Sequence, residues 1–577
     1  MAKKVKVKIH KKSKSERLFE YVSNTRELCE LLESREDRTL FSYFTFDHRL
    51  ADMTYSEFGR MVKNCAAGLT SLGFAGKKIA VMGETSPQWL CMYLSVLVTG
   101  GIVIPMDREL APEETAKFLE WVDADGIAYS PSLANNIAKV RENTEKLSIF
   151  IPFAGDDRSS DVVSVSQLEL IGEPSVEAGY EYPDISEKYE DVAEYLFTSG
   201  TTGSSKCVML SEKNIFSVVM SACETVEFEP DDTIVSVLPM HHTYELMCTI
   251  AAMAYSMHIC INDSLSHVIK NFKLFKPTGL VLVPLFIYTM HKKIWAEAKK
   301  GGRENALKAG IIASGTMKAA GIDIRRKVFA EVLAAFGGRL KKIVCGGAAL
   351  DPLMIEAFEN FGVSVYEGYG ITECSPLAAV TPYYARKYGS VGLPVPCCDI
   401  RIDPDVNEVG DKGYVTGEIQ VKGDNVMIGY FDNPGANADV FTPDGWFRTG
   451  DVGYIDDDGY LFITGRQKSV IVLENGKNVF PEEIEEYISH IEEIAECVVV
   501  GRNAEDGNKV DLVAVVYPNY AKFTDDAGED NIRRSLEHSI AAMNRKLPTF
   551  KRVMKIEVRS TEFEKTHTKK IKRHLVK

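Results

Sequence analysis

The sequence lacks any pair of cysteines in a C-x-x-C arrangement, although twelve cysteines are scattered along its 577 residues. Cys397 and Cys398 are adjacent, but neighbours in sequence rarely have the geometry of a good disulfide. The pattern therefore argues against a disulfide framework and against a zinc site. It indicates a reduced, intracellular protein.

Long apolar runs are also missing. The most apolar stretch, residues 89–105, is interrupted by Thr99-Gly100-Gly101. Because a membrane-spanning helix needs about 20 apolar residues, this stretch instead predicts a short helix, a glycine turn and a strand. No apolar segment follows the basic N-terminus, which excludes a secretory signal. We therefore expect a cytoplasmic protein.

Basic residues are fewer than acidic ones, with 67 Lys and Arg against 82 Asp and Glu. The net charge of −15 argues against general nucleic-acid binding. The first fourteen residues are an exception, because seven of them are lysines. This run has two interpretations: a solvated tail, and peripheral contact with an anionic inner membrane surface, to which each Lys contributes about 1 kcal/mol.

The chain is too long for one hydrophobic core, so at least two domains are expected. Strand-like runs at 233–238, 279–284 and 342–345 alternate with helical segments, and Asp351-Pro352 begins a helix. This alternation predicts an α/β fold with largely parallel sheets. Glycine and aspartate turns between short strands predict a β-rich subdomain near residues 390–465.

A compact α+β unit is expected after Arg466. Its predicted elements are a helix from Pro481, strands near 496–501 and 511–517, a helix near 530–544, and a strand near 553–558. We place the boundary at residues 467–469. The chain then divides into a large N-terminal domain (1–466) and a small C-terminal domain (467–577).

Residues 195–206 read Y-L-F-T-S-G-T-T-G-S-S-K, a short strand followed by hydroxyl side chains, glycines and a lysine. Glycines allow the backbone to approach a ligand closely, while hydroxyls and a lysine bind phosphate oxygens. The loop is not a Walker A motif, because Ser205 rather than glycine precedes the lysine. The segment predicts a polyphosphate site formed by Thr198, Ser199, Gly200, Thr201, Thr202, Gly203 and Lys206.

The pattern T-S-G-T-T-G-x-x-K resembles the signature of the acyl-adenylate-forming superfamily, which includes acyl-CoA synthetases, adenylation domains and luciferases. Further matching segments follow in the family's order: L-P-M-H-H-T-Y-E, G-G-A-A-L, Y-E-G-Y-G-I-T-E, F-R-T-G-D-V-G-Y-I-D and L-F-I-T-G-R-Q-K. The resemblance implies a two-step reaction. A carboxylate attacks the α-phosphate of ATP and releases pyrophosphate, and a thiol then displaces AMP.

The resemblance also implies roles for residues of the large domain. Gly347, Ala348 and Gly370 line the nucleotide, Tyr369 stacks on adenine, and Thr372 contacts the α-phosphate. Glu373 binds Mg²⁺, which prefers carboxylate and phosphate oxygens. Asp451 accepts hydrogen bonds from the ribose hydroxyls, and Arg466 makes a second ribose or phosphate contact.

The segment L-P-M-H-H-T-Y-E borders the acyl pocket in the family, and His242 occupies the position of its common histidine. The resemblance implies a hydrogen bond from His242 near the substrate carboxylate and gating of the pocket. Amino-acid-activating relatives carry an aspartate in this region, but residues 238–246 contain none. We therefore expect an acid without an α-amino group.

The C-terminal domain is expected to be mobile. By resemblance, Lys468 is the hinge between two domain arrangements, and Gly476 lies beside the pantetheine channel of CoA. Lys570 matches the catalytic lysine, although Lys569 stands where the family usually has glycine.

Glu245 and the tail T-K-K-I-K-R-H-L are most similar to long-chain fatty acyl-CoA synthetases. We expect an AMP-forming ligase that activates a medium- or long-chain fatty acid with ATP, Mg²⁺ and CoA. An aryl-CoA ligase and an acyl-carrier-protein ligase use the same adenylation chemistry and remain alternatives. An adenylate oxidase and a nucleotide-binding scaffold without catalysis are the other classes considered.

Overall fold

A computed structural model describes most of the chain. The described residues are 17–35, 37–144, 146–155, 159–199, 205–405, 409–410, 412–473, 478–503, 510–523, 528–565 and 571–576. The basic N-terminal run lies outside these residues, so its membrane contact stays a prediction. In the part of the chain that is described, no helix is long and apolar enough to cross a membrane.

A nine-stranded sheet forms one half of the large domain, in the order β15-β14-β13-β12-β11-β9-β10-β1-β2. Its strands β9 to β13 and β1 are parallel, as the alternation of strands and helices predicted. The bounds are β1 (Thr39–Phe44), β2 (Leu50–Thr54), β9 (Thr233–Ser236), β10 (His258–Ile261), β11 (Gly279–Leu282), β12 (Lys342–Cys345), β13 (Ser364–Gly370), β14 (Leu377–Val380) and β15 (Leu393–Pro394).

A seven-stranded sheet forms the other half, in the order β18-β8-β7-β4-β3-β5-β6. The bounds are β3 (Lys78–Met82), β4 (Ile102–Met106), β5 (Gly126–Tyr129), β6 (Ile149–Pro152), β7 (Val192–Ser199), β8 (Ser205–Ser211) and β18 (Gly429–Tyr430). Strands β3 to β7 are parallel, and β7 pairs antiparallel with β8. Thr198 and Lys206 therefore stand opposite each other where these two strands end.

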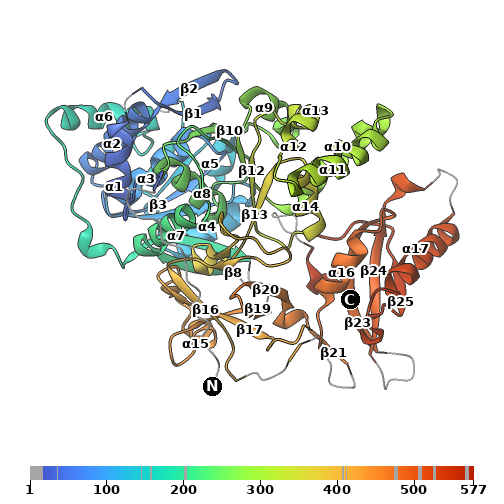
Figure 1. The fold of residues 1–577 in the computed structure, drawn as a ribbon. Coiled ribbons are helices and arrows are strands. Elements are labelled where there is room, and N and C mark those ends of the chain that lie inside the picture. The colour runs from blue at the N-terminus through green and yellow to red at the C-terminus, as the bar shows by residue number, and fades with distance from the viewer. Residues whose placement is uncertain are drawn as a thin grey trace.

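Helices surround and join the two sheets (Figure 1). They include α1 (Thr25–Ser34), α2 (Tyr55–Ser71), α3 (Pro87–Val98), α4 (Pro112–Trp121), α5 (Ala134–Glu142), α6 (Val165–Glu177), α7 (Glu212–Thr225), α8 (Thr243–Ala254), α9 (Val268–Phe275), α10 (Pro284–Lys300), α11 (Glu304–Ala319), α12 (Arg325–Val328), α13 (Ala330–Ala334) and α14 (Pro352–Asn360). The apolar stretch at 89–105 forms α3, a glycine turn and β4, as predicted. Because α3 is apolar all round, it is buried in the core.

The predicted β-rich region contains a four-stranded antiparallel sheet in the order β16-β17-β19-β20. Its strands are β16 (Cys398–Ile402), β17 (Gly417–Gly423), β19 (Phe447–Ile455) and β20 (Leu461–Arg466), and α15 (Pro434–Val440) lies beside it. The backbone turns between β19 and β20 at Asp456–Asp458, as expected for a hairpin turn. Lys387 pairs with Asp458 at 2.6 Å and also with Asp456.

The C-terminal region has its own hydrophobic core. Strands β23 (Ile494–Asn503), β24 (Val510–Pro518) and β25 (Lys555–Val558) form a sheet, with α16 (Pro481–Ser489) and α17 (Glu529–Asn544) packed on it. A two-stranded ribbon of β21 (Ile471–Val472) and β22 (Asn478–Val479) precedes α16.

The C-terminal region contacts the large domain beside α14 (Figure 1). His490, the residue after α16, is hydrogen-bonded to the Asp351 carboxylate. Asp351 is the N-cap predicted from sequence, and its other carboxylate oxygen accepts a hydrogen bond from the Leu353 backbone. One buried carboxylate therefore caps a helix and joins the two regions.

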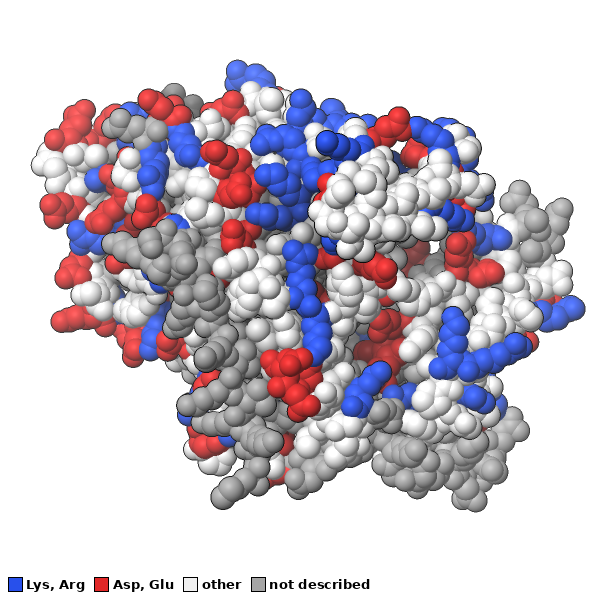
Figure 2. All heavy atoms as spheres, viewed as in Figure 1, with Lys and Arg blue, Asp and Glu red and all other residues white. Residues whose placement is uncertain are grey.

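Figure 2 shows acidic and basic side chains spread over the visible face of the molecule. Lys and Arg gather where Figure 1 places α9, α12 and α13, in contrast to the net negative charge of the whole chain.

Candidate active site

Asp451 is held at the centre of a polar cluster. It lies in β19 directly opposite Arg466 of β20. Arg466 Nε approaches Asp451 Oδ1 at 3.0 Å, and the Tyr369 hydroxyl donates a hydrogen bond to Oδ2 at 2.8 Å. Only 5% of Asp451 is exposed. Three residues that the sequence predicted for one nucleotide site are thus in direct contact.

Tyr369 lies near the end of β13, where the sheet meets this cluster. Burial and the neighbouring Asp451 carboxylate raise the pKa of its hydroxyl well above its ordinary value, so it stays a hydrogen-bond donor. The next residue must be glycine, because a Cβ at Gly370 would lie 1.7 Å from the Pro376 carbonyl oxygen.

Glu373 belongs to the short 3₁₀ helix η5 (Thr372–Cys374), and Thr372 begins that helix. The Tyr430 hydroxyl donates a hydrogen bond to Glu373 Oε1 at 2.8 Å. Lys206 Nζ lies 4.2 Å from the centre of the same tyrosine ring. Tyr430 therefore joins the end of the predicted phosphate-binding hairpin to the predicted metal ligand.

The surroundings of Glu373 fit a magnesium ion held together with phosphates. Mg²⁺ is commonly bound by one or two carboxylates and by substrate phosphates rather than by an all-protein cage. Within the described residues, no group of three or more His, Cys, Asp and Glu side chains is arranged to hold a metal. The role of Glu373 as magnesium ligand stays a prediction.

The turn after β12 lies beside this region. Gly347 has φ of +84°, a conformation that L side chains rarely adopt, so this turn requires glycine. Gly347 and Ala348 are exposed, as a nucleotide-lining turn requires.

Six predicted site residues lie outside the described residues: Gly200, Thr201, Thr202, Gly203, Gly476 and Lys570. The backbone of Ser199 ends β7. Lys468 lies in the 3₁₀ helix η6 (Gln467–Ser469), at the junction predicted for the hinge. The proposed roles of all these residues remain predictions.

His242 is the residue immediately before α8, and its ring centre lies 4.2 Å from that of His241. His241 Nε2 lies 3.8 Å from Asp107 Oδ2. Helix α8 then lines an apolar pocket with five residues: Tyr244, Met247, Cys248, Ala251 and Ala252. His242 therefore precedes a pocket wall, as the resemblance implied for this segment.

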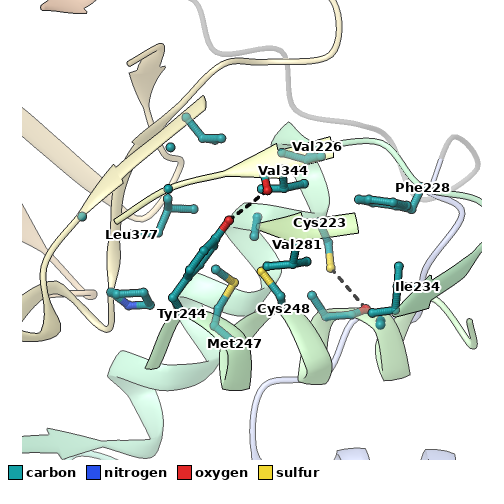
Figure 3. Close-up of a pocket in the computed structure, with 18 of the residues that line it drawn as sticks. Cys223, Val226, Phe228, Ile234, Tyr244, Met247, Cys248, Val281, Val344 and Leu377 are labelled. Atoms are coloured by element: carbon teal, nitrogen blue, oxygen red, sulfur yellow. Dashed lines mark hydrogen bonds between the residues drawn. The ribbon is translucent and has the colours of Figure 1, made fainter. Parts of the chain in front are cut away.

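The pocket lies between α7, α8 and strands of the nine-stranded sheet (Figure 3). The cavity volume of this pocket is about 110 Å³. None of the described residues that line it is charged. Gly346, Gly347, Tyr369 and Gly370 line one end, so this pocket adjoins the Asp451 cluster.

Two residues of this site were not predicted from the sequence. Tyr430 had no motif to mark it, because its contacts with Glu373 and Lys206 are long-range in sequence. Tyr244 lay within a recognised segment, but its hydroxyl contacts two distant strands, reaching Val344 O at 3.1 Å and Leu282 O at 3.3 Å. Only the fold brings these groups together.

Family models agree with this arrangement. A model of the AMP-binding enzymes matches residues 31–431, and a model of the AMP-binding enzyme C-terminal domain matches residues 468–577. The chain belongs to the AMP-binding enzyme family. The acyl-adenylate resemblance and the two-domain α/β fold expected from sequence are therefore confirmed. ATP, Mg²⁺ and CoA, which the resemblance implied, are the cofactors of this adenylate-forming family.

Curated relatives within the AMP-binding enzymes share about a quarter of their residues with this chain. Long-chain-fatty-acid–CoA ligase FadD15 of Mycobacterium bovis is 29% identical over 482 residues, which are 78% of this chain and 75% of that protein. Human long-chain-fatty-acid–CoA ligase 1 is 26% identical over 496 residues, covering 81% and 69%.

A solved structure of an AMP-binding enzyme has the same fold. The ATP-bound MatB from Rhodopseudomonas palustris superimposes with a TM-score of 0.71 at 23% identity, covering 96% of this chain and 98% of that one. At this level of identity the likeness concerns the fold alone.

Proposed function

We propose that the protein is an ATP-dependent, AMP-forming carboxylate–CoA ligase whose acid is a fatty acid of medium or long chain. The observation that carries the proposal is the position of Tyr369. Its hydroxyl contacts Asp451, while the same residue lines an uncharged pocket. An alkyl chain in that pocket brings its carboxylate to the residues predicted to hold ATP.

The character of the pocket favours a fatty acid over an amino acid. No charged side chain among the described lining residues is available to hold an ammonium group. Burying an unpaired charge in such a site costs several kcal/mol, whereas each buried CH₂ group contributes about 0.8 kcal/mol. An aryl acid also suits an apolar pocket, so an aryl-CoA ligase is the second candidate.

Adenylation must bring two anions together. Their repulsion and their lost freedom of motion oppose the reaction, so positioning and charge neutralisation provide most of the catalysis. Asp451 and Arg466 orient the ribose, and Lys206 neutralises phosphate charge. Glu373 would hold Mg²⁺, which would supply positive charge to offset that of the triphosphate and of the leaving pyrophosphate. A carboxylate oxygen then displaces pyrophosphate to give the acyl-adenylate, and the CoA thiol displaces AMP.

Lys570 is proposed to approach the α-phosphate from the C-terminal domain during adenylation and to withdraw before the thiol enters. Lys570→Ala should lower the rate of adenylation by about a hundredfold or more, because a cation is lost where charge develops. Thioester formation from supplied acyl-adenylate should be largely retained. Lys569→Ala is the matched control and should leave both steps near their original rates. Equal loss of both steps in Lys570→Ala would contradict this assignment.

The proposed function is tested by measuring pyrophosphate release with saturated fatty acids, aryl acids and amino acids, each with and without CoA. The expected result is release with fatty acids and formation of the corresponding acyl-CoA when CoA is present. A preference for aryl acids favours the second candidate. A thioester formed on a phosphopantetheine carrier protein but not on CoA favours an acyl-carrier-protein ligase. Pyrophosphate release only with amino acids would contradict the proposal.

A further inference from the structure

The apolar pocket extends from the nucleotide site along the strands of the nine-stranded sheet. Strands β9, β11 and β12 beside the pocket are parallel, so residues paired in register lie at the same depth along it. Ile234, Gly279 and Lys342 stand at one level, where their strands begin. Gly346, which lines the other end, is four residues beyond Lys342 along the chain. Figure 3 shows Phe228 beside Ile234, on the side of the pocket opposite Leu377.

Resting on the proposed function, we infer that the Phe228 ring is the floor of the acyl site and limits the length of the fatty chain. The depth follows from strand geometry. Four strand residues span about 13 Å, and an extended alkyl chain advances about 1.25 Å per bond when bonds of about 1.5 Å meet at about 111°. The pocket therefore accommodates a straight chain of about ten carbons.

The Phe228 ring is fixed from three sides. The Tyr255 ring meets it edge-on, with the centres 6.2 Å apart. Lys342, the first residue of β12, places its Nζ 4.9 Å from the centre of the Phe228 ring. Gly279 leaves room for it, because a Cβ there would lie 2.6 Å from Phe228 Cε1. Any larger residue at position 279 would therefore clash with the Phe228 ring.

The backbone that carries Phe228 is also held. The Tyr255 hydroxyl donates a hydrogen bond shared between Cys223 O, at 2.7 Å, and Val226 O, at 3.0 Å, just before the loop. Lys342 Nζ donates a hydrogen bond to Glu227 O at 2.6 Å. Asp232 Oδ2 accepts one from the Glu229 backbone at 2.9 Å and lies 3.4 Å from Lys342 Nζ. A loop anchored at both ends forms a fixed floor rather than a gate that opens with each substrate.

Two substitutions should move this floor in opposite directions. Phe228→Ala removes the ring and deepens the pocket toward Lys342, whose long side chain can turn its ammonium group to solvent. Gly279→Ala has no backbone strain, since Gly279 does not have positive φ. Its methyl group displaces the ring into the pocket and shortens the site. Phe361→Leu removes part of a more deeply buried ring that does not line the pocket, and serves as the control.

The experiment is kcat/KM for saturated acids of six to eighteen carbons, with unfolding temperatures measured for every variant. We expect the wild-type protein and Phe361→Leu to prefer chains near ten carbons. One methylene that a pocket rejects commonly changes kcat/KM about tenfold. Phe228→Ala should therefore raise the ratio of hexadecanoate to decanoate by about tenfold or more, with Phe228→Leu intermediate. Gly279→Ala should raise the ratio of hexanoate to decanoate by a similar factor.

Three results would overturn the inference: a wild-type preference for hexadecanoate over decanoate, an unchanged profile in folded Phe228→Ala and Phe228→Leu, and an unchanged profile in folded Gly279→Ala. In these cases fatty-acid activation itself persists, so the proposed function survives while the floor is wrongly placed. Absence of pyrophosphate release with every fatty acid would instead contradict the proposed function, and the inference with it.

Discussion

The two ends of the candidate site are built in different ways. At the nucleotide end, polar side chains from β8, β13, η5, β18, β19 and β20 are joined by hydrogen bonds and ion pairs. At the acyl end, apolar side chains from α7, α8 and the nine-stranded sheet surround a pocket with no charged lining among the described residues. Polar contacts restrict residue type and geometry, whereas apolar walls require only shape and volume.

This contrast predicts separable effects. Substitutions at the nucleotide end should weaken the reaction with every acid alike. Substitutions at the acyl end should change which acid is used and leave the affinity for ATP nearly unchanged. Tyr369 belongs to both ends and is the exception.

The largest effect is expected from Asp451→Ala. The change removes the acceptor of the Tyr369 hydroxyl and the partner of Arg466. Hydrogen bonds to charged groups contribute about 1.5–3 kcal/mol each, so the loss of two should lower kcat/KM for ATP by about a hundredfold or more. Pyrophosphate release with a fatty acid and an aryl acid provides the measurement, and the ratio between the acids should stay constant. A changed ratio would show that the two ends are not separable.

A smaller effect is expected where Tyr430 supports Glu373. Glu373→Gln keeps the shape of the side chain but removes its charge, so the Mg²⁺ concentration for half-maximal activity should rise. Tyr430→Phe removes one hydrogen bond to that carboxylate and should cost about tenfold in kcat/KM for ATP. Titration of activity with Mg²⁺, after treatment with a chelator, measures both.

Tyr430→Phe serves as the control for Glu373→Gln, because it leaves the Glu373 charge in place. If Tyr430→Phe shifts the Mg²⁺ dependence more than Glu373→Gln does, Glu373 is not the metal ligand.

The smallest effect concerns Glu245, which lies on α8 behind the wall of the acyl pocket. Burial raises the pKa of this carboxyl to about 8. Its folded-state pKa therefore exceeds the ordinary value of 4.5, and the folded protein binds the proton more tightly than the unfolded chain does. The contribution of this group to stability should fall as the pH rises from about 4.5 through about 8.

Glu245→Gln should accordingly reduce the loss of unfolding temperature between pH 5.5 and pH 8.5, by a few degrees at most. Burial also raises the pKa of Glu194, in β7, to about 8, and Glu194→Gln offers a matched comparison away from the pocket. A Glu245→Gln profile as steep as that of the wild-type protein would show that Glu245 is ionised in the folded state.

The same contrast explains what could be predicted from the sequence. Asp451, Arg466 and Tyr369 were recognised because each lies in a short segment that resembles a family motif, and the structure brings them into contact. The Asp351 cap and the helix after it were predictable from local chemistry. Tyr430 was not, because its role depends on the pairing of β18 with β8.

The acyl end could not be predicted in detail. Phe228, Ile234, Tyr255 and Met257 meet only because a loop, a strand and the residues after α8 pack together. Their residue types are those of any hydrophobic core, so nothing in the sequence distinguishes them from buried side chains elsewhere. Volume and register, rather than residue type, define this end.

The proposed reaction requires one ATP to bind at Asp451, Glu373 and Lys206, so that an acid oxygen displaces pyrophosphate. The most direct measurement follows the nucleotide products of the purified protein with decanoic acid, Mg²⁺ and CoA. We predict AMP and pyrophosphate in equal amounts, each matched by decanoyl-CoA. Formation of ADP and inorganic phosphate, or binding of ATP without any acid-dependent cleavage, would contradict the account.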